Sequence, residues 1–238
     1  MVNSLVLRCM DRRFNNMVES EYGDAIVLGN AGANVYPLQD RIRDIVREEG
    51  IEKIIALPHT DCGARGKVYS VLKGGSSADD DLMEELVSHY PPSKFSTRQE
   101  LEKMNYEIQL ARLKELFPDM KASGRLFDTG SIDAPKEELE HKLVVMKPGK
   151  PDYSRVFASL RLNPFQCYVV QAETEIAMAD IKLAVKELGA KTVYFVTMDG
   201  DNPRDTKQEA DRAALALSGV EGVEIRMHDM RRVRKSLA

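Results

Sequence analysis

Three residues in the N-terminal third of the chain combine the side chains that bind zinc: Cys9, His59 and Cys62. Cys9 follows the apolar run Ser4–Arg8, and the other two follow the apolar run Lys53–Leu57. Two thiolates and one imidazole select zinc over magnesium or calcium. Three protein ligands leave one tetrahedral position open, which is typical of catalytic zinc sites. The sequence therefore predicts one Zn²⁺ held by these residues.

Two charged residues come directly after Cys9. In an extended chain, Cys9, Asp11 and Arg13 point to the same side. We expect Asp11 to accept a hydrogen bond from a zinc-bound hydroxide, and Arg13 to hold that carboxylate ionised through a bidentate contact. The alternative is that Asp11 and Arg13 form only a structural ion pair.

The elements that must position these residues alternate between strands and helices. Such alternation predicts an α/β fold with a mostly parallel sheet flanked by helices. In open parallel sheets, ligands bind beyond the carboxyl ends of the strands. In the first 57 residues, strands are expected over 4–8, 25–29 and 53–57, and helices over about 15–21 and 37–49.

The remaining chain is expected to continue this pattern after an interruption. Residues 63–96 depart from the pattern, and within them 74–81 have the composition of a loop or insertion, while 148–164 have that of a connector. Thr97 and Glu100 form a predicted capping box. The helix that follows, to about Phe117, should turn Leu101, Met104, Ile108 and Leu113 to the core. Further strands are expected over 124–128, 142–147, 167–171, 191–197 and 223–227, and further helices over 173–188 and 204–217. We expect one domain over 1–238, with a zinc-site half over about 1–120 and additional sheet and helices over about 121–238.

Other residues with potential ligands receive structural interpretations. Asp61 should cap the turn after it, and Cys167 should lie in a strand of the core. The loop Asp199–Asn202 could supply oxygen ligands to a metal, but such residues are also typical of turns and helix caps. The remaining histidines, which lie in polar surroundings and should be on the surface, are His89, His141 and His228.

Composition bounds the function classes. The 238 residues are 43% hydrophobic and 30% charged, with a net charge of −4. The sequence has no basic stripe of the kind that predicts nucleic-acid binding, and its basic segment 231–235 is short. Three cysteines make no disulfide framework, and no apolar run reaches membrane length. No secretory leader pattern is visible at the N-terminus. We therefore expect a soluble cytoplasmic protein that acts on a small molecule.

The order and spacing of three segments resemble the β-class carbonic anhydrases. These segments are Cys9-Met10-Asp11-x-Arg13, then Asn30-Ala31-Gly32, then His59-Thr60-Asp61-Cys62-Gly63. The resemblance covers about residues 4–66 and implies a zinc enzyme that hydrates carbon dioxide reversibly to bicarbonate by zinc-bound hydroxide. It also implies a homodimer or higher homo-oligomer.

Carried over by position, the resemblance makes Cys9, His59 and Cys62 the zinc ligands, and Asp11 and Arg13 the catalytic dyad. In some family members the aspartate moves onto zinc and displaces the water. Two alternatives stay open. One is a hydrolase of carbon disulfide or carbonyl sulfide on the same zinc platform, and the other is a zinc-binding homologue without catalysis.

Overall fold

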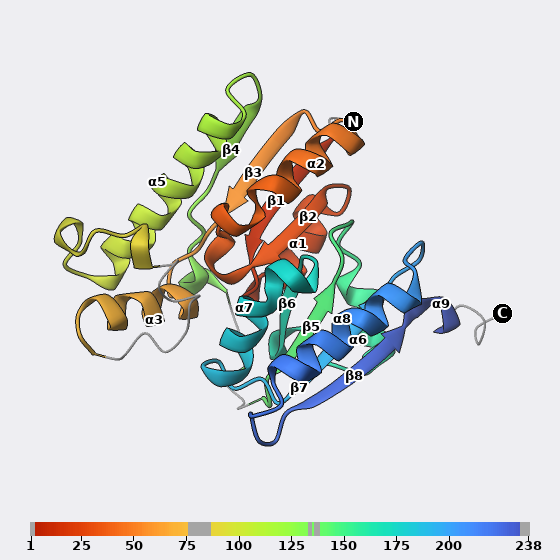
Figure 1. Ribbon diagram of the computed structural model, residues 1–238. Coiled ribbons are helices and arrows are strands. Elements are labelled where there is room, and N and C mark those ends of the chain that lie inside the picture. Colours follow the sequence, from red (N-terminus) through yellow and green to blue (C-terminus); the bar gives the residue numbers. More distant parts are fainter. Residues whose placement is uncertain (1–2, 76–86, 133–134, 136–138, 234–238) are drawn as a thin grey trace. The chain divides into compact units, whose positions relative to one another are not determined.

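The computed structural model describes residues 3–75, 87–132, 135 and 139–233 (Figure 1). The chain divides into two compact units. Unit 1 comprises residues 1–9 and 31–133, and unit 2 comprises residues 10–30 and 134–238. The chain thus leaves unit 1 after its first strand and returns to it at Ala31. The expected boundary near residue 120 stays a prediction.

Unit 1 contains a parallel three-stranded sheet in the order β4-β3-β1. Its strands are β1 (Ser4–Cys9), β3 (Lys53–Leu57) and β4 (Lys121–Gly124). β1 and β3 are neighbours, and Arg8 pairs with Leu57. The carboxyl ends of both strands therefore lie side by side. This is the arrangement that brings Cys9 close to the loop after β3.

Among the residues that the structure describes, three α-helices accompany this sheet. α2 (Gln39–Glu49) ends at Gly50, whose φ of 59° lies in the left-handed region that glycine adopts freely. α3 (Gly63–Leu72) begins directly after Cys62, where no helix was predicted. Most of the loop or insertion expected over 74–81 lies outside the described residues, which omit 76–86. α5 (Arg98–Leu116) begins with the predicted capping box and packs on β3 and β4 (Figure 1).

The buried face of α5 differs from the expected apolar stripe. Leu101 and Leu113 are fully buried, as predicted. Met104 and Ile108 are only partly buried against a cluster around Val68. Three polar side chains on this helix are also buried, namely Glu102, Asn105 and Gln109. Buried polar groups need hydrogen-bond partners, so these three side chains are expected to make hydrogen bonds inside unit 1.

Unit 2 contains a five-stranded sheet in the order β2-β6-β5-β7-β8. β2 is antiparallel to β6, and the other pairs are parallel. The expected connector over 148–164 contains a helix, α6, so that expectation was wrong. The strands are β2 (Ile26–Asn30), β5 (Lys142–Met146), β6 (Cys167–Gln171), β7 (Thr192–Thr197) and β8 (Glu224–Asp229). The helices are α1 (Asn15–Tyr22), α6 (Tyr153–Leu160), α7 (Thr174–Lys186), α8 (Pro203–Ala216) and α9 (Met230–Val233).

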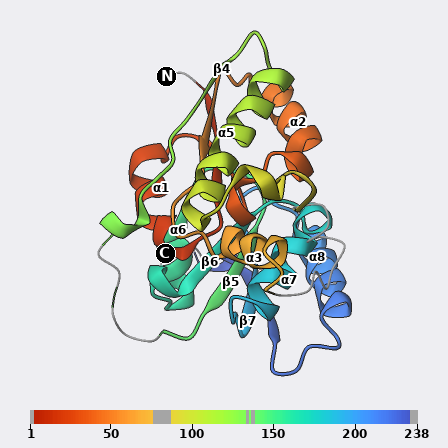
Figure 2. The same cartoon turned by 90° about the vertical axis from the view of Figure 1, so that its left-hand side faces the viewer.

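The parallel part of unit 2 is doubly wound. The chain runs from β5 to β6, crosses back over β5 to β7, and continues to β8. Figure 2 shows α6 on one face of these strands and α7 and α8 together on the other. The winding direction therefore reverses between β5 and β7, which makes their carboxyl ends a topological switch point. Across the described residues, none of the helices is both long and apolar enough to cross a membrane.

Candidate metal centre

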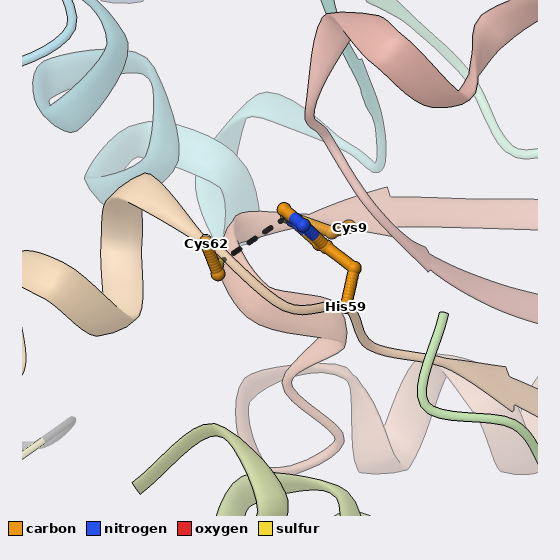
Figure 3. A group of neighbouring side chains, drawn as sticks. All are labelled: Cys9, His59 and Cys62. Atoms are coloured by element: carbon orange, nitrogen blue, oxygen red, sulfur yellow. Dashed lines mark hydrogen bonds between the residues drawn. The ribbon is translucent and has the colours of Figure 1, made fainter. Parts of the chain in front are cut away.

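Cys9, His59 and Cys62 converge in unit 1 (Figure 3). Their ligand atoms lie within 4.8 Å of one another, and the three residues are no more than 3% exposed. Cys9 is the last residue of β1, and the other two lie in the loop between β3 and α3. Within the described part of the chain this is the one cluster of its kind. The predicted convergence of the three side chains is therefore present.

The donor set fits a zinc ion. The sulfur atoms of Cys9 and Cys62 are 3.9 Å apart. Two sulfurs bound tetrahedrally to one zinc would be about 3.8 Å apart, given Zn–S bonds of about 2.3 Å. Nδ1 of His59 lies 2.7 Å from the carbonyl oxygen of Thr60. A proton on Nδ1 makes this hydrogen bond and leaves the lone pair on Nε2 for a metal.

Neighbouring groups favour the thiolate form of Cys62. Its pKa is lowered well below the ordinary value, first by a hydrogen bond from the Cys9 thiol. Burial acts in the opposite direction, and the positive charges of His59 and Arg65 lower the pKa further. The backbone N–H of Gly32 donates to the Cys9 sulfur over 3.2 Å. Both sulfurs therefore have contacts that stabilise negative charge, the form in which cysteine binds metal.

The buried cation Arg65 depends on a glycine. Its guanidinium lies 5.0 Å from the centre of the Tyr90 ring, and its Nη2 donates to the carbonyl of Ala31 over 3.3 Å. Gly32 has a φ of 73°, and a Cβ at this position would lie 2.4 Å from Nη2 of Arg65. Only glycine therefore satisfies both the backbone conformation and the space beside Arg65.

A carboxylate on α5 holds the loop that carries two of the donors. Glu102 is 2% exposed and accepts a hydrogen bond from the backbone N–H of Cys62 over 2.9 Å. Arg98, one turn earlier, donates to Glu102 and also pairs with Asp61, each over 3.0 Å. Asp61 has a φ of 52°, which is unusual for a residue with a side chain. Arg98 and Glu102 thus act as a clamp on this strained loop.

The same helix face also binds the loop after residue 30. The side-chain amide of Asn105 donates to the carbonyl of Gly32 over 3.0 Å, and the backbone N–H of Val35 donates to Gln109 over 2.8 Å. The site residues Glu102, Asn105 and Gln109 were not predicted from the sequence. The signal was available, because polar residues at i, i+3 and i+7 lie on one side of a helix. The helix was interpreted instead from its apolar stripe, as a helix that packs on the core.

Asp11 and Arg13 lie in unit 2 and form a bidentate pair. Nε and Nη2 of Arg13 lie 2.9 and 2.8 Å from the two carboxylate oxygens of Asp11. The expected extended geometry was wrong, because Asp11 caps a 3₁₀ helix over Arg12–Phe14 and accepts from the Arg13 backbone N–H. The intervening Arg12 donates to the carbonyl of Phe165. The pair therefore arises from a turn rather than from strand alternation.

Other residues with potential ligand atoms were expected to have structural roles. Cys167 is fully buried at the start of β6, as expected. Asn202 caps α8, and Asp201 accepts from the backbone N–H of Met198, so the turn interpretation of that loop is confirmed. The N-cap of α3 is Cys62 rather than Asp61. The three remaining histidines are partly buried, which corrects the surface expectation for His89, His141 and His228.

Comparison with known proteins finds a family similar to the segment that contains the candidate metal centre. A family model described as carbonic anhydrase matches residues 4–118. These residues are therefore similar to that family, which confirms the resemblance over this range, and residues 119–238 lie outside the match.

Solved structures of carbonic anhydrases show weaker likeness. The beta-carbonic anhydrase CcaA is 18% identical, with a TM-score of 0.39, over 58% of this chain and 79% of its own. A carbonic anhydrase from Glaciozyma antarctica is 20% identical, with a TM-score of 0.33, over 54% of this chain and 77% of its own. Among curated proteins, no relative matches this chain.

Proposed function

We propose that the protein is a zinc-dependent carbonic anhydrase that interconverts carbon dioxide and bicarbonate. The observation that supports this most is the buried cluster of two thiols and one imidazole within the segment that matches the family model. Cys9, His59 and Cys62 would hold the ion. Zinc, when bound, supplies a Lewis acid that activates water at neutral pH. The remaining catalytic roles are proposed for side chains of this protein.

Asp11 and Arg13 are the proposed catalytic dyad. Asp11 would accept a hydrogen bond from the attacking water and so orient its lone pair toward the carbon of the substrate. Arg13 keeps this carboxylate ionised, because two charge-assisted hydrogen bonds stabilise the anion. Moving the carboxylate onto the metal would require it to give up a bond to Arg13. The pair therefore supports an arrangement in which the water position stays open.

The test combines metal content with turnover. Purified protein should contain about one zinc per chain and catalyse carbon dioxide hydration across about pH 6.5–9, the range in which a metal-activated water titrates. Asp11→Asn should retain zinc and lose most of its turnover, since an amide does not supply the carboxylate acceptor. Glu175→Gln, which changes a carboxylate of unit 2 that is 85% exposed, serves as the control and should change neither quantity.

The same assay separates the two alternatives. Hydrolysis of carbon disulfide or carbonyl sulfide, without hydration of carbon dioxide, would assign the sulfur analogue as substrate. Zinc binding without turnover of any of the three substrates would favour a non-catalytic homologue. Full hydration activity in Asp11→Asn would remove the proposed role of that carboxylate.

A further inference from the structure

Unit 2 has a crevice of its own at the switch point between β5 and β7. A cavity of about 230 Å³ opens there, between the loop after Met146 and the loop after Thr197. In doubly wound sheets this is the place where ligands bind, because loops on either side diverge from the two strand ends. The crevice lies in the part of the chain that the carbonic anhydrase family model does not match.

Charges of both signs line this crevice in equal number. The cations are Lys147, Lys150 and Arg155, and the carboxylates are Asp152, Asp199 and Asp201. The two lysines are already paired within the protein, since Lys147 contacts Asp205 over 3.2 Å and Lys150 contacts Asp24 over 3.3 Å. A ligand with a single charge would disturb this balance, because it would face a like charge on one side of the crevice. A ligand with one ammonium and one carboxylate matches both sets. The methionines at the two strand ends, Met146 and Met198, add an apolar part to the lining.

The crevice is preformed. Arg155, on α6, bonds Asp152 on its own side over 2.9 Å and Asp199 on the opposite loop over 3.0 Å. This double contact ties the two loops together before any ligand arrives, which lowers the entropy that binding must overcome. A Cβ added at Gly149 would meet no heavy atom within 4 Å, so the lining has open space beside this residue.

We propose that this crevice binds a small zwitterion, a free α-amino acid or a compound of the same chemistry. Its carboxylate would face Lys147 and Lys150, and its ammonium would face Asp199 and Asp201. A volume of about 230 Å³ is below the roughly 300–1,000 Å³ of pockets for drug-sized ligands, so the ligand is small. The assignment does not rest on the proposed activity of unit 1.

The two methionines give a local readout in the full-length protein. The methyl groups of methionine are labelled with ¹³C, and Met146→Leu and Met198→Leu assign the two signals. L-leucine, L-glutamate and L-lysine are the probes. At least one should shift both signals saturably with half-saturation below about 1 mM. Its analogues that lack only the ammonium or only the carboxylate should bind at least about tenfold more weakly.

Two variants place the binding in the crevice. Gly149→Phe fills the open space and should abolish the shifts, while Gly219→Phe is the matched control, since a Cβ there also meets no heavy atom within 4 Å. Lys147→Gln combined with Lys150→Gln should weaken binding at least about tenfold without relying on the bulky substitution. Lys207→Gln, on the exposed part of α8, is the control and should not weaken binding.

Three results would overturn the proposal. The first is that none of the three amino acids gives a saturable shift up to about 10 mM. The second is that an analogue with a single charge binds as tightly as the amino acid. The third is that the shifts persist in both the Gly149 variant and the double lysine variant.

Discussion

The two units bury the same side chain with opposite results. Cys62 in unit 1 and Cys167 in unit 2 are both almost inaccessible to solvent. The pKa of Cys62 is lowered well below its ordinary value, first by the hydrogen bond from Cys9, whereas burial raises the pKa of Cys167 to about 12. The Cys167 thiol donates to the carbonyl of Asn163, and within the described part of the chain it belongs to no group of possible metal ligands. Neighbours, and not burial alone, decide which thiol is stabilised as the thiolate.

The strand ends of the two units differ in the same sense. In unit 1, sulfur and nitrogen donors at or after the ends of β1 and β3 form a buried site that suits one metal ion. In unit 2, β5 and β7 deliver paired charges that remain partly exposed around a crevice. Parallel strands make both places available for binding. The residues that follow each strand decide what kind of ligand each place suits.

The largest expected effect comes from replacing Cys62 and Cys167 with serine, one at a time. Cys62→Ser should lose more than the roughly 10- to 100-fold in metal affinity that substitution of a supporting residue costs, and with it the hydration activity. Cys167→Ser should keep both, because that thiol is buried in unit 2 and a serine hydroxyl can replace its hydrogen bond to Asn163. Zinc content by elemental analysis and stopped-flow hydration measure the pair. Equal zinc content in the two variants would break the comparison.

A smaller effect is expected where unit 1 requires glycine. Gly32→Ala and Gly50→Ala both place a side chain at positive φ, which costs about 1–2 kcal/mol. Only Gly32→Ala also drives a Cβ into Arg65, which adds about 1–3 kcal/mol. Urea unfolding of the two variants measures the difference. If they unfold at the same midpoint, the contact between Gly32 and Arg65 does not constrain the site.

The clamp on α5 should affect the metal rather than the fold. Glu102→Gln keeps the shape of the side chain but loses the charge that pairs with Arg98, so the loop that carries His59 and Cys62 is held less firmly. We expect zinc affinity to fall by about tenfold. Competition with a chromogenic chelator measures it.

The matched control for the clamp is Glu107→Gln. Glu107 lies on the same helix but is 61% exposed on its side chain and pairs only with Lys103 over 4.0 Å among the contacts described for it. An equal loss of affinity in both variants would show that Glu102 acts only through the helix as a whole.

The smallest expected effect is a pH dependence in unit 2. Burial lowers the pKa of His228, whose Nε2 lies 2.8 Å from Oγ of Ser159. The unfolded chain therefore binds a proton more readily than the folded one, and the folded state loses stability as the pH falls below the unfolded pKa of about 6.5. The protection factors of the β8 amides, which correct for the slower intrinsic exchange at lower pH, should fall between about pH 7.5 and 5.5, and less so in His228→Gln. An identical fall in the variant would assign the effect to another group.

The sequence by itself determined many of the elements and the identities of the candidate metal donors. The apolar runs before Cys9 and His59 are strong strand signals, and a strand pair that is parallel brings its carboxyl ends together. The capping box at Thr97 likewise needs only residues close in the chain, so the start of α5 was predictable. Helices α3 and α6 were missed because glycines and prolines around them favoured loops.

Tertiary structure alone decided which distant residues support the site. Glu102 reaches the Cys62 backbone across 40 positions, and Arg65 stands beside Gly32 across more than 30. No local pattern encodes such pairs, because they depend on how α5 and α3 pack on the sheet. Likewise, the pKa of Cys62 depends on charges and hydrogen bonds that exist only after folding, whereas its side-chain type was visible from the start.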